Sequence, residues 1–453
     1  MKAVTTEQIR HLDERTIAAG IPAIELMERA GYAVARTTFA LLKKRDARSV
    51  LLFAGKGNNG GDAFVAARHL ASAGCAVTLT LLCRRGELRG AALHHFQQLV
   101  GVKVLEWPDE LPAAAVIVDG LLGTGFTGVV REPYAAAIEF MNHQSAPIVA
   151  IDVPSGFAVR ATVTVTIGLP KIELLKNLDS AGRIEVADIG LSGDVVSDIE
   201  LIAPGDIHLP ARRRSMHKGD CGHLLIIAGS EGYTGAPVLC AHAAARAGVG
   251  LVTLAVPREI YPIVAAQCPP EIMPCPLESV TGKFDAVAIG PGLRAPVQQD
   301  FSTNVVLDAG ALVPEAIRPG VVITPHPGEM GRLIGKSATE VQATRWETAR
   351  QFARDKRVTL VLKGAGTVVT DAASPLWINA TGNPGMAKGG MGDALTGIIG
   401  ALLAQGLPAL EAAKVGVYLH GLAGDLAADK HGSRSMVTTD LINNLGAAFA
   451  TFE

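Results

Sequence analysis

A glycine-rich segment near the N-terminus has the composition of a ligand-binding loop. The run GKGNNGGD at 55–62 follows an apolar stretch that predicts a strand over 49–54, and we expect a helix to begin at Ala63. In an open parallel sheet, ligands bind beyond the carboxyl ends of the strands, where backbone N–H groups and a helix N-terminus can contact phosphate. The run is neither the GxGxxG fingerprint nor a Walker loop, but a tight turn would not need so many glycines and asparagines. We therefore predict a ligand site at 55–62.

Two more predicted strands end in an aspartate close to glycine. Asp119 opens DGLLGTGFTG at 119–128, and Asp152 opens DVPSG at 152–156. A buried aspartate at a strand end needs a partner, a cation or a proton. Each aspartate alone could cap a helix, but three polar strand ends on one edge of a sheet favour a functional site.

The second half of the chain carries a different glycine-rich segment, NPGMAKGGMGD at 383–393, followed by the helical pattern ALTGIIGALLAQG. Backbone N–H groups at such a helix N-terminus can stabilise the charge that builds up on a phosphoryl group during transfer. Asp393, where the helix begins, can accept the proton of a substrate hydroxyl that attacks this group. A simple N-cap would leave the glycine spacing unexplained, so we predict phosphoryl-transfer chemistry here.

Several other polar residues have two interpretations. His326 lies between two prolines after an apolar run, where substrate contact is favoured over a structural role. Lys388 could bind phosphate or be ordinary surface charge, and both alternatives stay open. Three arginines at 212–214 could form a phosphate patch, although charge in an exposed linker more often serves solubility.

Composition limits the classes of protein to which the chain can belong. Of its 453 residues, 49% are hydrophobic and 19% charged, which is typical of a compact, turn-rich α/β protein. A net charge of -2 supplies no long-range field to attract nucleic acid or an anionic membrane. The charged N-terminus and the lack of a long apolar segment predict a cytoplasmic protein without a membrane partner. The cysteines are not spaced like metal ligands, so we expect reduced thiols.

Short apolar runs that end in glycine or aspartate recur in both halves of the chain and alternate with helical patterns. Such runs suit strands buried on both faces of a parallel sheet, with helices as the crossovers of βαβ units. The chain exceeds the limit of about 250–300 residues for one hydrophobic core, so two domains are expected. Loss of apolar periodicity near 203–220 predicts a linker between domains at 1–205 and 215–453. The predicted fold class is α/β, with two three-layer domains.

The first domain resembles a known family. HLDERTIAAGIPAIELMERAG, GNNGGD, DGLLGTGFTG and DVPSG closely resemble segments of the NAD(P)H-hydrate epimerase domain, also known as the YjeF N-terminal domain. The resemblance implies a Rossmann-like fold, a K⁺ ion bound by Asn59, Asp119 and Ser155, and acid–base work by Asp152 at C6 of the nicotinamide hydrate. It also implies that the substrate is contacted by Asn58, Asn59, Gly60, Gly61, Asp62, Gly123, Thr124, Gly125, Phe126, Thr127, Gly128, Val129, Tyr134 and Asp152.

One segment departs from the family pattern. Family members usually continue PSGLDADTG with a loop, whereas here Phe157 to Arg160 lead directly to ATVTVTIGLP. Two hypotheses follow: the epimerase site is complete without the loop, or the domain has lost its activity and survives as a scaffold for assembly. Retention of Asn59, Asp119 and Asp152 favours an active site.

The second domain resembles the ADP-dependent NAD(P)H-hydrate dehydratase family. The resemblance is carried by AIGPGL, DAGAL, TPHPGEM, LKGAGTVV and NPGMAKGGMGDALTGIIGALLAQG, in the family's order. It implies a ribokinase-like fold and a reaction in which ADP phosphorylates the 6-hydroxyl of the S hydrate, after which elimination of phosphate leaves NAD(P)H and AMP. Arg294 stands where the family usually has glycine.

This resemblance also implies the residues of the second site. Those expected to face the hydrate are Ala236, Gly292, His326 and Asp393, and those expected to hold ADP are Lys363, Gly364, Ala365, Gly366, Thr367 and Gly392. Mg²⁺ is expected because transfer between phosphates normally needs a cation, although no all-carboxylate cage is visible in the sequence.

The two resemblances together imply a bifunctional enzyme that epimerises the R and S hydrates of NADH and NADPH and dehydrates the S hydrate. We also expect it to form a homo-oligomer. A ribokinase-like vitamin or sugar kinase with an inactive N-terminal scaffold is the alternative. Release of AMP and phosphate, rather than a stable phosphorylated product, would separate the two.

Overall fold

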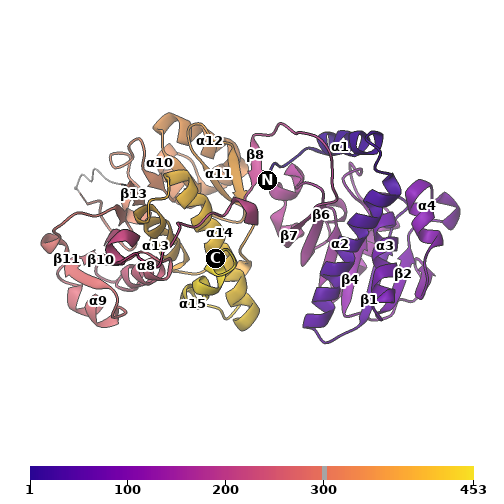
Figure 1. The fold of residues 1–453 in the computed structure, drawn as a ribbon, viewed down its shortest axis with the longest axis horizontal. Helices are drawn as coiled ribbons and strands as arrows, with labels where there is room; N and C mark the ends of the chain where they lie inside the picture. Colours follow the sequence, from indigo (N-terminus) through magenta and orange to yellow (C-terminus); the bar gives the residue numbers. More distant parts are fainter. Residues whose placement is uncertain (298–303) are drawn as a thin grey trace. The chain divides into compact units, whose positions relative to one another are not determined.

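The computed structural model describes residues 1–297 and 304–453, which form two compact units, Met1–Ser197 and Asp198–Glu453. Each unit has its own central sheet with helices packed against it (Figure 1). No helix in these two ranges is long and apolar enough to cross a membrane. Two largely parallel sheets, each covered by helices, confirm the predicted α/β class.

The sheet of the first unit has seven parallel strands in the order β3-β2-β1-β4-β5-β6-β7. They are β1 (Ser49–Ala54), β2 (Ala76–Leu81), β3 (Val102–Glu106), β4 (Val116–Gly120), β5 (Ile148–Ile151), β6 (Val163–Ile167) and β7 (Arg183–Ala187). β1 and β4 are neighbours although β2 and β3 separate them in the sequence, so the direction of strand addition reverses between them. Ligands of open α/β sheets bind beyond the strand ends at such a reversal.

Helices cover both faces of this sheet (Figure 1). They are α1 (Thr6–Ala18), α2 (Ala23–Lys44), α3 (Asn58–Ser72), α4 (Gly90–Gln97), α5 (Tyr134–His143), α6 (Ile172–Lys176) and α7 (Leu178–Ala181). One core joins Leu52 of β1 to Phe64 of α3, and another joins Phe53 of β1 to Met141 of α5. Successive residues of a strand point to opposite faces, so the apolar residues 50–54 of β1 contribute to both cores.

The helix after β1 begins earlier than predicted. α3 starts at Asn58 and not at Ala63, because Gly57 takes the N-cap position and the N–H of Gly61 already donates to Gly57 O at 3.1 Å. The asparagines and glycines that suggested a loop therefore form the first turns of the helix. Its N-terminus lies directly at the carboxyl end of β1.

The second unit has a sheet in the order β11-β10-β9-β12-β13-β14-β15-β16-β17-β8, in which β16 is antiparallel to both of its neighbours. The strands are β8 (Ile199–Leu201), β9 (His223–Ile227), β10 (Leu251–Val256), β11 (Met273–Pro276), β12 (Ala286–Ile289), β13 (Asn304–Leu307), β14 (Val322–Ile323), β15 (Thr359–Leu362), β16 (Thr367–Thr370) and β17 (Leu376–Asn379). Because β13, β14 and β15 are parallel neighbours, the residues after them meet at one edge of the sheet.

The helices of the second unit include one apolar helix that lies in the core. They are α8 (Gly235–Arg246), α9 (Tyr261–Gln267), α10 (Pro327–Ile334), α11 (Ala338–Ala343), α12 (Arg345–Lys356), α13 (Met391–Ala404), α14 (Ala409–His431) and α15 (Thr438–Phe449). α13 packs against α8, α14 and the sheet, and every residue from Ala394 to Ala404 is buried (Figure 1). A helix that is apolar all round belongs inside a core, which fixes its N-terminus firmly at the sheet edge.

The compact units separate before the predicted linker. β8 pairs with β17 through Ile199 and Leu376, so the second unit begins at Asp198, whereas the sequence predicted a first domain to residue 205 and a linker near 203–220. A strand of three residues that includes Glu200 is too short to show an apolar period, and for this reason the sequence did not reveal it.

Candidate active sites

The strand ends of the first unit surround a cavity of about 490 Å³. Lys56 to Asn59 and Asp62 reach it from the end of β1, residues 121–126 from the end of β4, and Asp152 from the end of β5. A second cavity of about 670 Å³ shares some of these walls, namely Arg10, Gly123, Thr124, Phe126 and Lys171. The two cavities therefore lie where the strand order of the sheet reverses, and they share part of one wall.

Asp152 is held in an unusual backbone conformation by a buried lysine. Its φ of 66° lies in the left-handed region, which non-glycine residues seldom adopt. The carboxylate accepts from the N–H of Ile167 at 3.1 Å and forms an ion pair with Lys171 Nζ. That ammonium also donates to Ile167 O at 2.6 Å and Thr166 Oγ1 at 3.2 Å, and its side chain is 1% exposed. Both charges are therefore compensated and oriented at the cavity wall.

Asp119 is fully buried and lacks a cation partner in the described part of the chain. Its carboxylate accepts from the N–H of Ser155 at 2.8 Å and the Ser155 hydroxyl at 2.6 Å. Burial raises the pKa of Asp119 to about 6, although the hydrogen bonds from Ser155 and Leu121 lower it. Asn59 lies against the same loop, since its Oδ1 is 2.3 Å from where a Cβ on Gly123 would stand. Carboxylate, hydroxyl and amide oxygens gathered around an uncompensated charge are suitable donors for a hard monovalent cation.

The structure separates the predicted substrate residues of the first unit into three groups. Asn58, Asn59, Asp62, residues 123–126, Tyr134 and Asp152 line the 490 Å³ cavity, and Thr127 and Gly128 line the 670 Å³ cavity. Gly60, Gly61 and Val129 line neither: a Cβ on Gly60 would lie 1.9 Å from Gly55 O, one on Gly61 would lie 2.3 Å from Met27 Sδ, and Val129 is 82% exposed. Close packing of the loop and helix α2 therefore accounts for two of the glycines.

Two charged residues of this site escaped the sequence analysis. Asp13 of α1 and Lys171, just before α6, both line the 490 Å³ cavity. Asp13 stood inside the HLDERT segment, but nothing in its spacing distinguished it from a surface charge on a helix. Lys171 follows Pro170 after β6, a strand end with no glycine-rich run to mark it. Only the fold brings these two side chains to Asp152.

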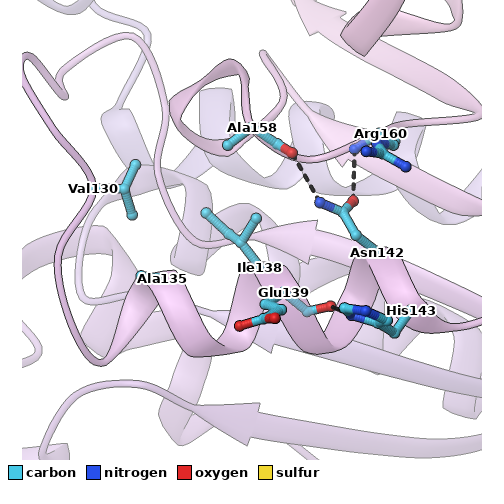
Figure 2. Close-up of a pocket in the computed structure, with 8 residues that line it drawn as sticks. All are labelled: Val130, Ala135, Ile138, Glu139, Asn142, His143, Ala158 and Arg160. Carbon is cyan, nitrogen blue, oxygen red and sulfur yellow. Dashed lines mark hydrogen bonds between the residues drawn. The ribbon is translucent and has the colours of Figure 1, made fainter.

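The shortened segment after Gly156 lies beside another cavity, of about 420 Å³ (Figure 2). Figure 2 shows Asn142 of α5 bridging this segment: its side chain donates to Ala158 O and accepts from the N–H of Arg160, both at 2.9 Å. Among the described residues, none lines both this cavity and the two at the strand ends. The short connection is therefore anchored to α5 at Ala158 and Arg160, whereas Phe157, at its start, lines the cavity of about 670 Å³.

A second buried lysine organises the site of the other unit. Lys363, directly after β15, contacts Asp308 Oδ1 at 2.6 Å and lies 3.7 Å from Glu329 Oε2. Asp308 follows β13 and also accepts from Thr324 at 2.9 Å and Thr396 of α13 at 3.0 Å. The Lys363 ammonium lies 3.2 Å from where a Cβ on Gly392 would stand. The lysine charge is thus fixed at the N-terminus of α13.

Asp393, in the first turn of α13, has no hydrogen-bond or ion-pair partner among the residues that the structure describes. Burial raises the pKa of Asp393 to about 6; Asp308 and Glu329 raise it further, whereas Lys363 lowers it. His420 lies buried nearby and contacts Met391 O at 3.0 Å, and burial lowers its pKa to about 4, so it stays neutral at physiological pH. Asp393 is therefore a carboxylate whose proton affinity suits a general base near neutral pH.

His326 has a structural role that the sequence left as the lesser alternative. It is the N-cap of α10, and its Nδ1 accepts from the N–H groups of Gly328 at 3.0 Å and Glu329 at 3.2 Å. Glu329 completes a capping box by accepting from the N–H of His326 at 2.8 Å. The ring remains about half exposed, and its Nε2 lies 3.4 Å from Glu329 Oε1.

The predicted nucleotide loop at 363–367 is fastened from behind by Arg345. The guanidinium donates to Leu362 O at 3.1 Å, Lys363 O at 3.4 Å and Gly366 O at 3.2 Å. Lys388 is likewise occupied, because its ammonium donates to Arg434 O at 2.7 Å and Met436 O at 2.5 Å. Lys388 thus holds the glycine-rich segment in place, a third role beside the two that the sequence left open.

Ala236 and Gly292, which were expected to face the hydrate, lie side by side. A Cβ on Gly292 would stand 3.0 Å from that of Ala236, and Gly292 O accepts from the Ser230 hydroxyl at 2.7 Å. On the same helix as Ala236, Leu239 packs against Gly390, since a Cβ there would be 2.5 Å from Leu239 Cδ1. The start of α8 therefore lies beside the glycine-rich N-terminus of α13.

Two family models match the chain. One described as the YjeF-related protein N-terminus matches residues 23–172, and one described as NAD(P)H-hydrate dehydratase matches residues 224–446. Among solved structures, the ADP/ATP-dependent NAD(P)H-hydrate dehydratase from Bacillus subtilis, co-crystallized with ATP/Mg²⁺, is 32% identical with a TM-score of 0.50. That similarity covers 54% of this chain and 95% of the other. A ribokinase-like superfamily protein from Enterococcus faecalis is 26% identical with a TM-score of 0.51 over 58% of this chain and 99% of that chain, which agrees with the ribokinase-like fold expected of the second unit.

Full-length relatives join the two halves. The bifunctional NAD(P)H-hydrate repair enzyme of Moorella thermoacetica is 39% identical over 98% of this chain and 96% of its own length. The enzyme of the same description from Coxiella burnetii is 38% identical over 97% of each chain. The first alignment extends over 509 residues, more than the 453 present here, so that relative carries segments that this chain lacks. Similarity across both units shows that the chain belongs to the family of bifunctional NAD(P)H-hydrate repair enzymes.

Proposed function

We propose that the chain repairs hydrated NADH and NADPH in two steps. The first unit interconverts the R and S hydrates at C6, and the second unit dehydrates the S hydrate at the expense of ADP. The observation that carries the proposal is that each unit places an aspartate and a buried lysine at the ligand-binding edge of its sheet, Asp152 with Lys171 in one and Asp393 near Lys363 in the other.

An active epimerase is supported by what the shortened segment leaves intact. Ser155 keeps both hydrogen bonds to Asp119, and Asp152 keeps its contact with Lys171, even though the connection that follows is short. We propose that the oxygens of Asn59, Asp119 and Ser155 hold K⁺, whose charge would compensate Asp119 and fix the loops after β1, β4 and β5. The scaffold hypothesis gives no reason for keeping a fully buried carboxylate without a cation.

In the dehydratase, Asp393 accepts the proton of the 6-hydroxyl as its oxygen attacks the β-phosphoryl group of ADP. The leaving group is AMP, and loss of phosphate together with the C5 proton then forms the C5=C6 bond of NAD(P)H. Residues 363–367 and Gly392 hold the nucleotide, and the backbone amides at the start of α13 face the transferred group. Ala236, Gly292 and His326 complete the wall for the hydrate.

The negative charge of this site suits Mg²⁺, but the described side chains do not form a ready-made metal site. Asp308, Glu329 and Asp393 outnumber the single ammonium of Lys363, which leaves excess negative charge. The described residues contain no group of three or more His, Cys, Asp or Glu side chains placed to hold a metal ion. Mg²⁺ would thus enter with the phosphates of ADP and neutralise them, as Mg²⁺ bound mostly through substrate oxygens does.

One assay tests the proposal. Purified protein is mixed with both epimers of hydrated NADPH, ADP, Mg²⁺ and K⁺, and the absorbance of reduced nicotinamide is followed together with AMP and phosphate. We expect full conversion of the epimer mixture with one AMP and one phosphate per NADPH. A stable phosphorylated product would favour the alternative sugar or vitamin kinase, and faster turnover with ATP than with ADP would overturn the choice of donor.

The cellular location and the assembly of the chain stay predictions. Nothing in the described residues tests cytoplasmic location or formation of a homo-oligomer. Size-exclusion chromatography with light scattering would measure the second directly.

A further inference from the structure

We infer that Asp62 is the general acid of the epimerase and that it works across the cavity from Asp152. The inference rests on the proposed epimerase activity and assigns the second proton-transfer group that this reaction requires. Asp62 belongs to α3, the helix that follows β1, and lines the same 490 Å³ cavity as Asp152 and Lys171.

The side chain of Asp62 is buried, yet it has no partner. The residue is 6% exposed, and no described residue gives its carboxyl group a hydrogen bond or an ion pair. It does not cap α3, whose N-cap is Gly57 and receives no side-chain hydrogen bond. A buried carboxyl group without a partner is costly to keep, and Asp62 lies beyond the first turn of α3, where the helix dipole gives little compensation. The free polar atoms of Asp62 are therefore available to a ligand in the cavity.

The charges around the cavity explain which group holds a proton. Three carboxyl groups, those of Asp13, Asp62 and Asp152, line it, but the buried Lys171 ammonium is in contact with Asp152. Burial raises the pKa of Asp62 well above its usual value; the charges of Asp152 and Asp13 raise it further, and Lys171 offsets only part of this. Arg10, Lys56 and Tyr134 are the other titratable groups that line the cavity. These surroundings favour the protonated form of Asp62, whereas Asp152 is paired with the Lys171 ammonium.

Inversion at C6 needs one carboxyl group that donates a proton and another that accepts a proton. Asp62 gives its proton to the 6-hydroxyl, the C6–O bond breaks, and water leaves as the nitrogen lone pair of N1 forms a C6=N1 double bond. Water then adds to the opposite face of C6, its oxygen forming the new bond as the C6=N1 electron pair returns to N1, and its proton passes to Asp152. Transfer of that proton back to Asp62 restores the starting state, so no oxidant or other co-reactant is needed. A carboxyl group that favours its protonated form, beside a carboxylate paired with an ammonium, is an arrangement suited to such acid–base work.

The test compares Asp62→Asn with Asp13→Asn in the full-length protein. Conversion of purified R hydrate to S hydrate is followed by chromatography without ADP, so the second unit takes no part. We expect Asp62→Asn to lose about 10²–10⁴-fold in kcat, the range of a general acid, with a small change in KM. Dehydration of purified S hydrate with ADP, measured on the same sample, reports that the chain is folded.

Asp13→Asn serves as a second measurement, because it removes a carboxylate that lines the same cavity. The matched control is Glu14→Gln on the same helix, whose exposed side chain lines neither cavity at the strand ends and which should leave kcat near the parent value. Because the Asp13 charge raises the pKa of Asp62, its removal should move the alkaline limb of the epimerase pH profile to lower pH. This shift remains measurable even if Asp62→Asn does not fold.

Three results would overturn the inference. Asp62→Asn could keep the parental kcat, it could change KM alone with an unaltered pH profile, or the alkaline limb could stay in place in Asp13→Asn. If the parent itself fails to convert R to S hydrate, both the proposed epimerase activity and the role of Asp62 are contradicted. If the parent is active and Asp62→Asn is equally active, only the assignment of Asp62 is wrong.

Discussion

The two units use the same pair of side chains in different ways. In the first unit the buried lysine is in contact with Asp152, the aspartate that we assign to proton transfer, whereas in the second it is in contact with Asp308, and Asp393 has no partner among the described residues. Burial and the neighbouring carboxylates raise the pKa of Asp393 to about 6. The comparison teaches that an aspartate buried at a sheet edge holds its proton more tightly when the lysine there pairs with a different carboxylate.

The glycine-rich segments of the two units also differ in what their glycines do. Gly60 and Gly61 of the first unit are needed for contact with Gly55 and Met27, inside a helix that has already begun. In the second unit a Cβ at Gly392 would approach the Lys363 ammonium to 3.2 Å, beside the amides that open α13. Similar glycine-rich patterns therefore serve mainly close packing in the first site. In the second site they let the Lys363 ammonium come close to the start of α13.

The largest effect should follow from removing the unpaired base of the second unit. Asp393→Asn should lower the rate of ADP-dependent dehydration by about 10²–10⁴-fold, because the 6-hydroxyl loses its proton acceptor. Nucleotide binding, measured by calorimetry, should persist, since the amides and Lys363 are unchanged. Epimerisation in the same sample is the internal control. Dehydration within threefold of the parent would remove Asp393 from this role.

The corresponding change in the first unit should affect only one epimer. With Asp152→Ala, the dehydratase consumes the S hydrate alone, so an equal mixture of epimers should stall near half conversion while the parent proceeds to completion. Early time points must be compared, because spontaneous epimerisation restores the S hydrate slowly. Removing one partner of a buried ion pair costs about 3–5 kcal/mol, so the rate on pure S hydrate must be measured as a check on folding. If the parent stalls as well, the scaffold hypothesis gains.

Strand ends were the most predictable part of the molecule. β1 begins and ends at the predicted residues, Asp119 lies near the end of the buried β4, and Asp152 directly follows the buried β5, because continuous apolar runs mark strands in a parallel sheet directly. The family and the fold of both units were likewise confirmed.

The partners of the aspartates were not predictable from local pattern. Only long-range packing brings Lys171, Asp13 and Asp308 to their sites, and no spacing in the sequence singles these residues out. The start of α3 was wrong because asparagine and glycine are weak helix formers, and tertiary contacts of the glycines override that propensity. The choice between the cap and the substrate for His326 could not be made without the geometry of α10.

A smaller effect should appear in the pH profile of the dehydratase. Its rate should fall as the pH drops through about 6, because Asp393 then becomes protonated. Lys363 lowers the pKa of Asp393, so Lys363→Met should move this acid limb to higher pH, by about one unit for a neighbouring charge. The matched control is Lys388→Met, since Lys388 donates to the carbonyls of Arg434 and Met436 and does not contribute to the pKa of Asp393. An acid limb near 4 in the parent, or equal shifts in both variants, would contradict the electrostatic argument.

The smallest effect tests whether the shortened segment belongs to the first site at all. Asn142→Ala removes two hydrogen bonds that anchor Ala158 and Arg160 to α5 (Figure 2), so the free energy of unfolding of the first unit should fall by about 1 kcal/mol. Epimerisation should stay near the parent rate, because the side chains of Asp152 and Ser155 are held by Lys171 and Asp119. Gln144→Ala, which loses one exposed hydrogen bond on the same helix, is the control for a surface change. Should Asn142→Ala abolish epimerisation while Gln144→Ala does not, the segment positions Asp152 after all, and the first site depends on its connection in a way that the second does not.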